Sequence, residues 1–159
     1  MSDALPDSAL KVQAVLARLG TPFQVVTMPA TTRTVQDAAA AIGCAVGQIV
    51  KSIVFRGAVS GKPVLVIASG ANRINEKSIA ALSGEPITKA SADFVRESTG
   101  FAIGGVPPVG FSRPIETWID ESLLQHSEVW AAAGTPNAVF SLDPQALPAM
   151  TGGKTVDIL

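Results

Sequence analysis

Apolar side chains near the N-terminus recur at the spacing of a helix. They form one apolar stripe, made of Leu10, Ala14, Val15 and Leu19. Asp7 or Ser8 can accept the hydrogen bonds that open such a helix, and Gly20 provides a stop. The pattern therefore predicts a helix over residues 7–19.

Three further segments combine a capping residue with an apolar stripe. Thr34, followed three residues later by Asp37, resembles a capping box before an alanine-rich helix over 35–42, which Gly43 ends. The other two helices begin at the capping residues Asn75 and Ser91 and extend to residues 82 and 98.

Runs rich in β-branched and aromatic residues predict strands. They cover residues 23–28, 49–55, 63–68, 101–103, 115–119, 129–132 and 138–142. A short turn with Gly57 and Gly61 joins the second run to the third, which predicts an antiparallel hairpin. Asp143 and Pro144 then predict a last helix, closed by Gly152.

The order of these elements favours one fold class. Helices and strands do not alternate strictly, and hairpins require antiparallel pairing, so we expect an α+β fold rather than a doubly wound one. Its sheet should be mixed, curved and largely antiparallel, with helices on its flanks. No repeat or linker divides the sequence, so residues 1–159 are interpreted as a single domain.

Composition and charge narrow the functional classes. The 159 residues are 47% hydrophobic and 16% charged, and 12 basic against 13 acidic residues give a net charge of -1. Such a chain is too apolar to be disordered and has no overall attraction for a nucleic acid such as DNA or for an anionic membrane, so any polyanion must be bound by a local patch. One cysteine and one histidine exclude an internal disulfide and a Cys/His zinc site. With no secretory signal and no apolar run long enough for a membrane span, we expect a cytoplasmic protein.

Lys51 is the most informative charged residue, because it lies inside an apolar strand. Ile49, Lys51 and Ile53 point to one face of that strand, while Val50 and Ser52 point to the other. A lysine among apolar neighbours is costly unless its ammonium reaches water, a carboxylate or a bound anion. Lys51 therefore either lines a cleft or extends outward from an edge strand.

Two loops are candidates for contacts to a ligand. In the first, Gly104, Gly105 and Val106 can direct main-chain N–H groups at a developing oxyanion, while Pro107 and Pro108 stiffen the chain. The alternative is a tight surface turn. In the second loop, Gly134, Thr135 and Asn137 place donors and acceptors at the end of a strand, or form a plain hairpin loop.

The single cysteine and histidine offer weaker candidates. Nothing in the sequence places Cys44 near His126, so a small buried side chain is favoured over a thiol nucleophile. His126 lies in a short polar segment and is interpreted as a surface residue.

Three motifs in this order resemble the YbaK/prolyl-tRNA synthetase editing-domain family. They are GQIVKSIVF over residues 47–55, STGF over 98–101 running into GGVPPVG over 104–110, and the segment 134–142. The resemblance extends over nearly the whole chain. It implies a freestanding trans-editing hydrolase of the α+β editing-domain fold, which deacylates mischarged aminoacyl-tRNA, mostly proline tRNA.

The resemblance also implies roles for individual residues. Lys51 would be the key polar side chain, steering the terminal adenosine and its phosphate, and the loop from Gly104 to Pro108 would supply main-chain groups near the scissile carbonyl. The terminal ribose hydroxyl would assist the attacking water, so no cofactor and no metal are expected. Further catalytic or wall positions are Gly105, Val106, Met28, Thr34, Ser52, Ala132, Gly134, Thr135 and Asn137.

The sequence departs from the cysteinyl-specific branch of the family. That branch has a serine before the glycine turn and an aspartate later, where this chain has Ala131 to Ala133 and Val139. A small apolar pocket should accept alanine or 2-aminobutyrate first and cysteine second, since one methylene changes binding by only about 1–3 kcal/mol.

The expected partner is the acceptor end of an aminoacyl-tRNA, with help from prolyl-tRNA synthetase or an elongation factor. A non-catalytic adaptor of the same fold is the alternative. A general nucleic-acid-binding protein is disfavoured because the basic residues are scattered and the sequence has no tyrosine.

Overall fold

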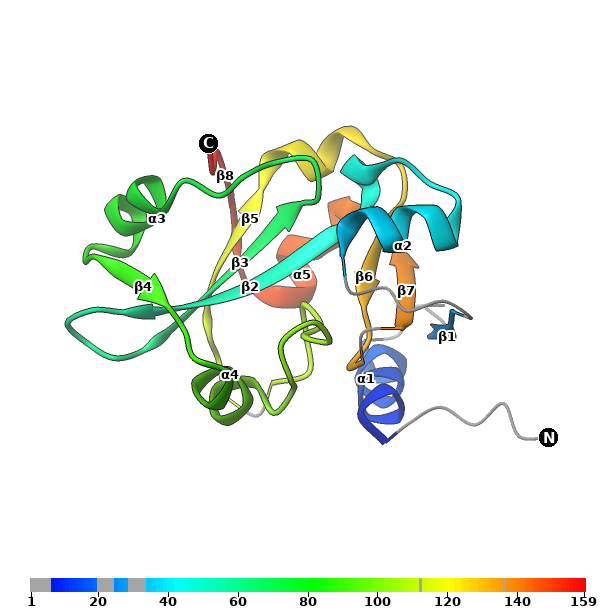
Figure 1. Cartoon of the computed structure of the whole chain (residues 1–159), viewed down its shortest axis with the longest axis horizontal. Helices are drawn as coiled ribbons and strands as arrows, with labels where there is room; N and C mark the ends of the chain where they lie inside the picture. The colour runs from blue at the N-terminus through cyan, green and yellow to red at the C-terminus, as the bar shows by residue number, and fades with distance from the viewer. Residues whose placement is uncertain (1–6, 20–24, 29–33, 112, 136) are drawn as a thin grey trace.

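The part of the chain that the structure describes forms two β-sheets and five α-helices, whose arrangement is drawn in Figure 1. The structure is a computed structural model, and it describes residues 7–19, 25–28, 34–111, 113–135 and 137–159. The elements form a mixed α+β fold, which confirms the predicted class.

The larger sheet has five strands in the order β4-β2-β3-β5-β8. β2 (Val50–Gly57) pairs antiparallel with β3 (Pro63–Ser69), as predicted, and its last residues also pair with β4 (Ile87–Lys89). β3 pairs in parallel with β5 (Glu116–Asp120), which pairs in parallel with β8 (Lys154–Val156). The sheet is therefore mixed, with its antiparallel hairpin next to two parallel pairs.

The smaller sheet has three antiparallel strands in the order β1-β7-β6. These are β1 (Val26–Thr27), β7 (Ala138–Leu142) and β6 (Val129–Ala132). A single parallel bridge between Ile49 and Trp130 links the beginning of β2 to β6. The two sheets thus meet where β2 begins.

The helices flank these sheets (Figure 1). They are α1 (Asp7–Arg18), α2 (Val35–Ile42), α3 (Glu76–Ser83), α4 (Ala92–Thr99) and α5 (Leu147–Thr151). Three 3₁₀ turns cover Val46–Gln48, Glu121–Gln125 and Pro144–Ala146.

The predicted caps of the middle helices are present. The side chains of Thr34 and Ser91 accept hydrogen bonds from the third N–H of α2 and α4, and Asn75 caps α3 in the same way. Gly43 and Gly100 end α2 and α4 in the left-handed conformation, with φ of 84° and 82°. Local sequence therefore determines where these helices begin and end.

Buried side chains of β3 lie on both faces of the larger sheet. Leu65 and Ile67 belong to the main core, between the two sheets and helices α1 and α4. Val64, Val66 and Ala68 belong to a second core with Ile79 of α3. Because both faces are covered, β3 is apolar along nearly its whole length.

Several predicted elements differ from the structure. Residues 101–103 form no strand: Phe101 is a buried core side chain, and its main chain turns directly after α4. The short strands β4 and β8 were not predicted, because three residues carry little periodicity. The last helix begins as a 3₁₀ turn at Pro144 and becomes α-helical only at Leu147. Residues 23 and 24 of the first predicted strand lie outside the described residues.

Candidate functional site

A cleft of about 550 Å³ lies along β2. Its walls come from β2, α2, the loop at residues 103–106, β6 and the segment after β3. The predicted residues that line it are Thr34, Lys51, Ser52, Gly104, Val106 and Ala132. Apolar side chains, among them Ile42 and Trp130, cover much of the remaining wall.

The cleft follows an open edge of the larger sheet. Hydrogen bonds from Gly70 N to Ile49 O (2.7 Å) and from Gly57 N to Lys62 O (2.9 Å) show that odd-numbered residues of β2 pair with β3. Even-numbered Ser52 and Val54 therefore direct their main-chain N–H and C=O groups to the opposite edge. Between the bridge at Ile49 and the start of the β4 pairing at Phe55, no described strand covers that edge. Main-chain donors and acceptors are thus presented to the cleft.

The Lys51 side chain is half-buried and tied to the segment that follows β3. Its Nζ donates a hydrogen bond to the main-chain oxygen of Asn72 at 2.8 Å. Burial lowers the pKa of the Lys51 ammonium, and the negative charge of Asp120 partly opposes this. Of the two alternatives for Lys51, the structure shows the cleft position.

Asp120 holds the acceptor of Lys51 in place. This carboxylate is 1% exposed and accepts hydrogen bonds from Ser69 N (3.0 Å), Asn72 Nδ2 (2.9 Å) and Ser122 N (2.9 Å). The Asn72 side chain is therefore fixed by Asp120, while the main-chain oxygen of Asn72 accepts the hydrogen bond that Lys51 donates. The orientation of Lys51 depends on a buried residue at the end of β5.

The loop with adjacent glycines is buried rather than a surface turn. Gly104 is exposed, but Gly105 to Val109 are buried. Gly105 N donates to Ala102 O at 3.0 Å, so that N–H group is engaged within its own turn. Within the described part of the chain, the N–H groups of Gly104 and Val106 have no such partner, and both residues line the cleft. These two are the candidate donors of the loop.

The second candidate loop packs directly on the first. Gly134 N donates to Gly105 O at 2.9 Å, and a Cβ on Gly105 would lie 2.8 Å from the carbonyl of Gly134. Within the second loop, Thr135 Oγ1 donates to Asn137 Oδ1 at 3.2 Å. The structure thus brings two glycine motifs from distant parts of the sequence into contact.

Some predicted positions lie away from the cleft. Met28 N donates to Asn137 O at 2.7 Å, which joins β1 to the second loop. Met28, Gly134, Thr135 and Asn137 are outside the described lining, and so is Gly105. Pro108 lines a different groove. The roles proposed for these residues stay predictions, and the contacts seen in the structure are those that support the loops.

Sequence reasoning missed Arg73 and Trp130 as lining residues. Arg73 lies in the segment held by Asp120, and Trp130 lies at the bridge between the sheets. No local pattern marks either residue, because tertiary packing alone brings them to β2.

The cysteine and histidine are separate from this chemistry. Cys44 is half-buried beside α2, and burial raises the pKa of its thiol. His126 is half-buried, and its Nε2 would lie 3.3 Å from a Cβ on Gly47. Among the described residues, no three His, Cys, Asp or Glu side chains are grouped to hold a metal ion. No described helix is long and apolar enough to cross a membrane.

Comparison of the sequence with models of known families identifies the family of this chain. Residues 29–149 match the model of the aminoacyl-tRNA editing domain. The chain belongs to the aminoacyl-tRNA editing domain family. This confirms the family resemblance of the three sequence motifs. It also confirms the expected enzyme class, an aminoacyl-tRNA deacylase.

Relatives of this editing domain include characterised folds and named proteins. A crystal structure described as a candidate trans-editing enzyme for prolyl tRNA synthetase superposes with a TM-score of 0.92 at 47% identity, covering 98% of each chain. The Bacillus subtilis protein YwhH is 34% identical over 121 residues, 76% of each protein. EbsC of Enterococcus faecalis, described as a candidate Cys-tRNA(Pro)/Cys-tRNA(Cys) deacylase, is 27% identical over 124 residues, which is 77% of this chain and 75% of EbsC.

Proposed function

We propose that this editing domain hydrolyses the ester of a mischarged aminoacyl-tRNA, with proline tRNA as the nucleic-acid part of the substrate. The observation that carries the proposal is the cleft along the open edge of β2. Lys51 lines it together with Gly104 and Val106, whose N–H groups have no hydrogen-bond partner among the described residues. The relatives named for proline tRNA and for prolyl tRNA synthetase support the choice of tRNA.

The arrangement of donors supports attack by water. The water oxygen bonds to the ester carbonyl carbon, and the carbonyl oxygen becomes an oxyanion near the N–H groups of Gly104 and Val106. The bond to the ribose oxygen then breaks, and that oxygen takes the proton that the water gives up through the neighbouring ribose hydroxyl. Lys51 holds the terminal adenosine and its phosphate by charge. The substrate hydroxyl acts as the base in this scheme, so no protein base is required.

The wall of the cleft supports a small aminoacyl group. Ala132, Ile42 and Val139 form an apolar part of that wall, and Thr34 and Ser52 also line the cleft. We therefore rank alanine and 2-aminobutyrate ahead of cysteine. An apolar pocket separates groups that differ by one methylene by about 1–3 kcal/mol, so the preference should be graded.

The test is a panel of proline tRNA charged separately with alanine, 2-aminobutyrate, cysteine, serine and proline. The expected result is fastest release of alanine or 2-aminobutyrate, slower release of cysteine, and little release of proline. Release of none of the five, with tRNA still bound, would replace the hydrolase with a non-catalytic adaptor.

A further inference from the structure

A second groove, of about 530 Å³, lies on the other side of the loop that lines the cleft. Its walls come from α1, residues 108–111 and 113–115, Thr117 of β5 and α5. Gly104 and Val106 line the cleft, whereas Pro108 to Gly110 line this second groove. One loop therefore separates the proposed reaction site from it.

Positive charge is concentrated in this groove. Lys11, Arg18 and Arg113 are among its lining residues, and the described lining includes no Asp or Glu. The side chains of Arg18 and Arg113 have no ion pair or hydrogen bond among the described residues, while the Nζ of Lys11 lies 4.8 Å from the centre of the Phe101 ring. Three of the 12 basic residues of a chain with net charge -1 thus share one groove. Such a surface fits a polyanion.

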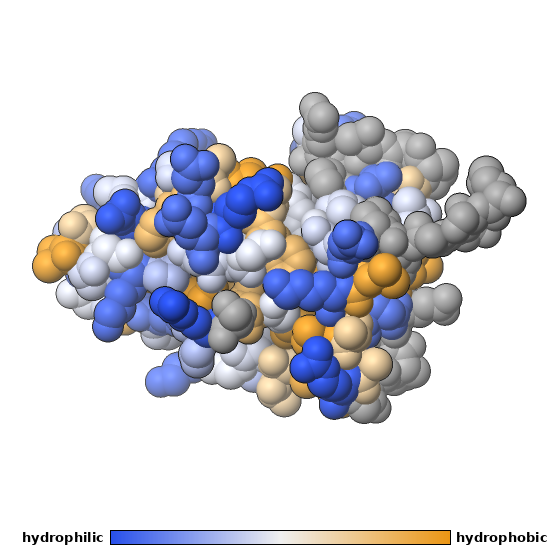
Figure 2. Space-filling view, turned by 90° about the horizontal axis from the view of Figure 1, so that it is seen from below, coloured by the Kyte–Doolittle hydropathy of each residue, from blue (hydrophilic) through white to orange (hydrophobic). Residues whose placement is uncertain are grey.

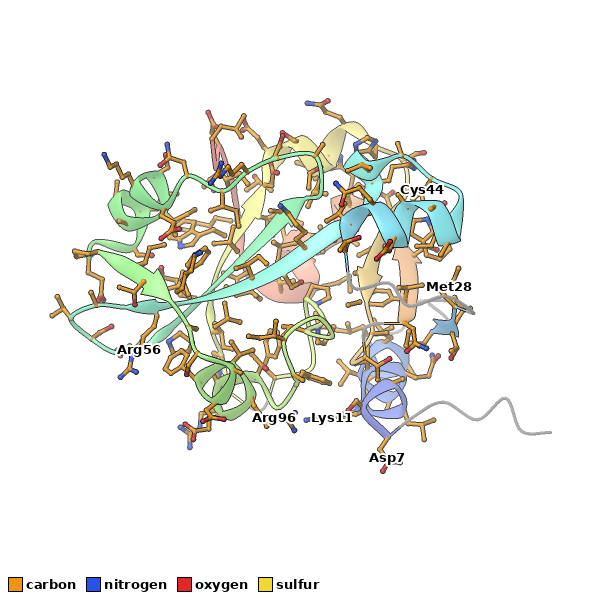
Figure 3. All side chains as sticks on the ribbon, viewed as in Figure 1. Asp7, Lys11, Met28, Cys44, Arg56 and Arg96 are labelled. Carbon is orange, nitrogen blue, oxygen red and sulfur yellow. The ribbon has the colours of Figure 1, made fainter. Side chains whose placement is uncertain are left out.

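The side of the molecule with α1 and α4 can be followed in the figures. Figure 3 shows Lys11 and Arg96 at the lower side of the molecule, near these helices. Figure 2, which looks at that side, shows hydrophilic residues among hydrophobic ones. Val15, Phe111 and Ile115 supply the apolar part of the groove itself.

The spacing of the cations suits a nucleic-acid backbone. Lys11 and Arg18 are seven residues apart on α1, so they lie on one face, about 10 Å apart along its axis. This separation corresponds to a few nucleotides along one strand of a duplex, so both cations can contact the same backbone. The six residue-to-residue steps from Gly104 to Gly110 span at most about 21 Å, so the groove lies within a few nucleotides of the cleft.

We propose that the second groove binds the phosphate backbone of the acceptor arm whose esterified end enters the cleft. This inference rests on the proposed function for the identity of its ligand. Lys11, Arg18 and Arg113 neutralise phosphates, and the apolar wall packs against the sugars. Contacts of this kind position a nucleic acid without reading its sequence.

The probe is uncharged proline tRNA, whose binding is followed by fluorescence anisotropy over a series of KCl concentrations. The variant is Arg18→Gln/Arg113→Gln. Its matched control is Arg56→Gln/Lys62→Gln, which removes two exposed charges that line neither the cleft nor the second groove. The groove variant should bind roughly tenfold more weakly at low salt, and its log-log salt slope should fall by about two. The control should keep the wild-type slope.

Two outcomes would overturn the inference: equal slopes in the groove variant and the control, or wild-type protein that binds no tRNA at low salt. If the double variant does not fold, Arg18→Gln and Arg113→Gln are measured singly, and each should lower the slope by about one. Because the probe carries no ester, the result is independent of hydrolysis. Groove-dependent binding of tRNA without release of any amino acid would contradict the proposed function but would still support tRNA binding by the groove.

Discussion

Lys51 owes its position to residues that are distant in sequence. Its ammonium donates to Asn72 O, and Asn72 is held by the buried carboxylate of Asp120. A lysine with three rotatable donors has little orientation of its own, so the acceptor decides where it points. Asp120 therefore acts on the proposed chemistry through Asn72, as a positioning residue.

The pKa of Lys51 should lie below 10.5, because burial disfavours the ammonium. Asp120→Asn should lower this pKa further, since it removes the nearby negative charge that raises it. The measurement is an NMR titration of the lysine side-chain carbons in wild type and variant. The control is Asp143→Asn. Asp143 accepts a hydrogen bond from Gln145 N and makes none with Lys51, Asn72 or Asp120. An ordinary pKa for Lys51 in the wild type would contradict this account.

The lowered pKa of Lys51 also determines how the free energy of unfolding changes with pH. Between the lowered pKa and 10.5 the unfolded chain holds the Lys51 proton more tightly than the folded protein does. The free energy of unfolding should therefore gain from Lys51 as pH rises through that window. The measurement is urea unfolding of wild type and Lys51→Met at several pH values. The variant should lack this increase in the free energy of unfolding. The same pH dependence in both proteins would contradict the prediction.

Gly105 tests the contact between the two glycine loops. A methyl group there would lie 2.8 Å from the main chain of Gly134, and neither backbone can yield without moving its loop. Gly105→Ala should lower the free energy of unfolding by about 1–3 kcal/mol, measured by urea denaturation, and should slow deacylation. Gly152→Ala is the control, because its Cβ meets nothing and only its φ of 73° resists the change. Wild-type stability and rate in Gly105→Ala would contradict the packing described here.

At the scale of elements, the cleft exists because β2 is longer than its neighbours on one side. β4 pairs only with Phe55, Arg56 and Gly57, while β6 meets the strand only at Ile49. Across the cleft from the intervening open edge lie side chains of α2 and the loop at 103–106 rather than another strand. A shift of either element would change the cleft.

The cap of α2 should therefore affect activity as well as stability. Thr34→Ala removes the acceptor of the Asp37 N–H and should lower the free energy of unfolding by about 1 kcal/mol, with a rise in KM for charged tRNA. Thr34→Ser should restore both. Ser91→Ala removes the equivalent bond of α4 and should lose similar stability while KM stays unchanged. Equal KM values in Thr34→Ala and Ser91→Ala would show that α2 does not shape the site.

At the scale of the whole molecule, sequence patterns predicted the parts that depend on neighbours in sequence. Helices α2, α3 and α4 could be located because their caps and terminal glycines are local, and the β2–β3 hairpin because its turn is short. The family motifs also pointed to Lys51 and to the loop at Gly104, and both line the cleft.

The remaining features depend on tertiary contacts. β4 and β8 are strands only because they pair with strands of an existing sheet. Phe101, which was predicted to lie in a strand, is instead a side chain of the main core. Asp120 could not be connected with Lys51, since 69 positions separate them and a buried carboxylate has no local signature. The groove of Lys11, Arg18 and Arg113 likewise combines separate segments.

The most direct test of the central claim is the single-turnover rate of alanine release from proline tRNA by wild type and by Lys51→Ala. Lys62→Ala, an exposed lysine of the β2–β3 turn, is the control for a lost charge. The cleft predicts a fall of roughly 10²–10³ in Lys51→Ala, the typical effect of losing one such electrostatic contact, and a wild-type rate in Lys62→Ala. A folded Lys51→Ala protein that releases alanine at the wild-type rate would contradict the account.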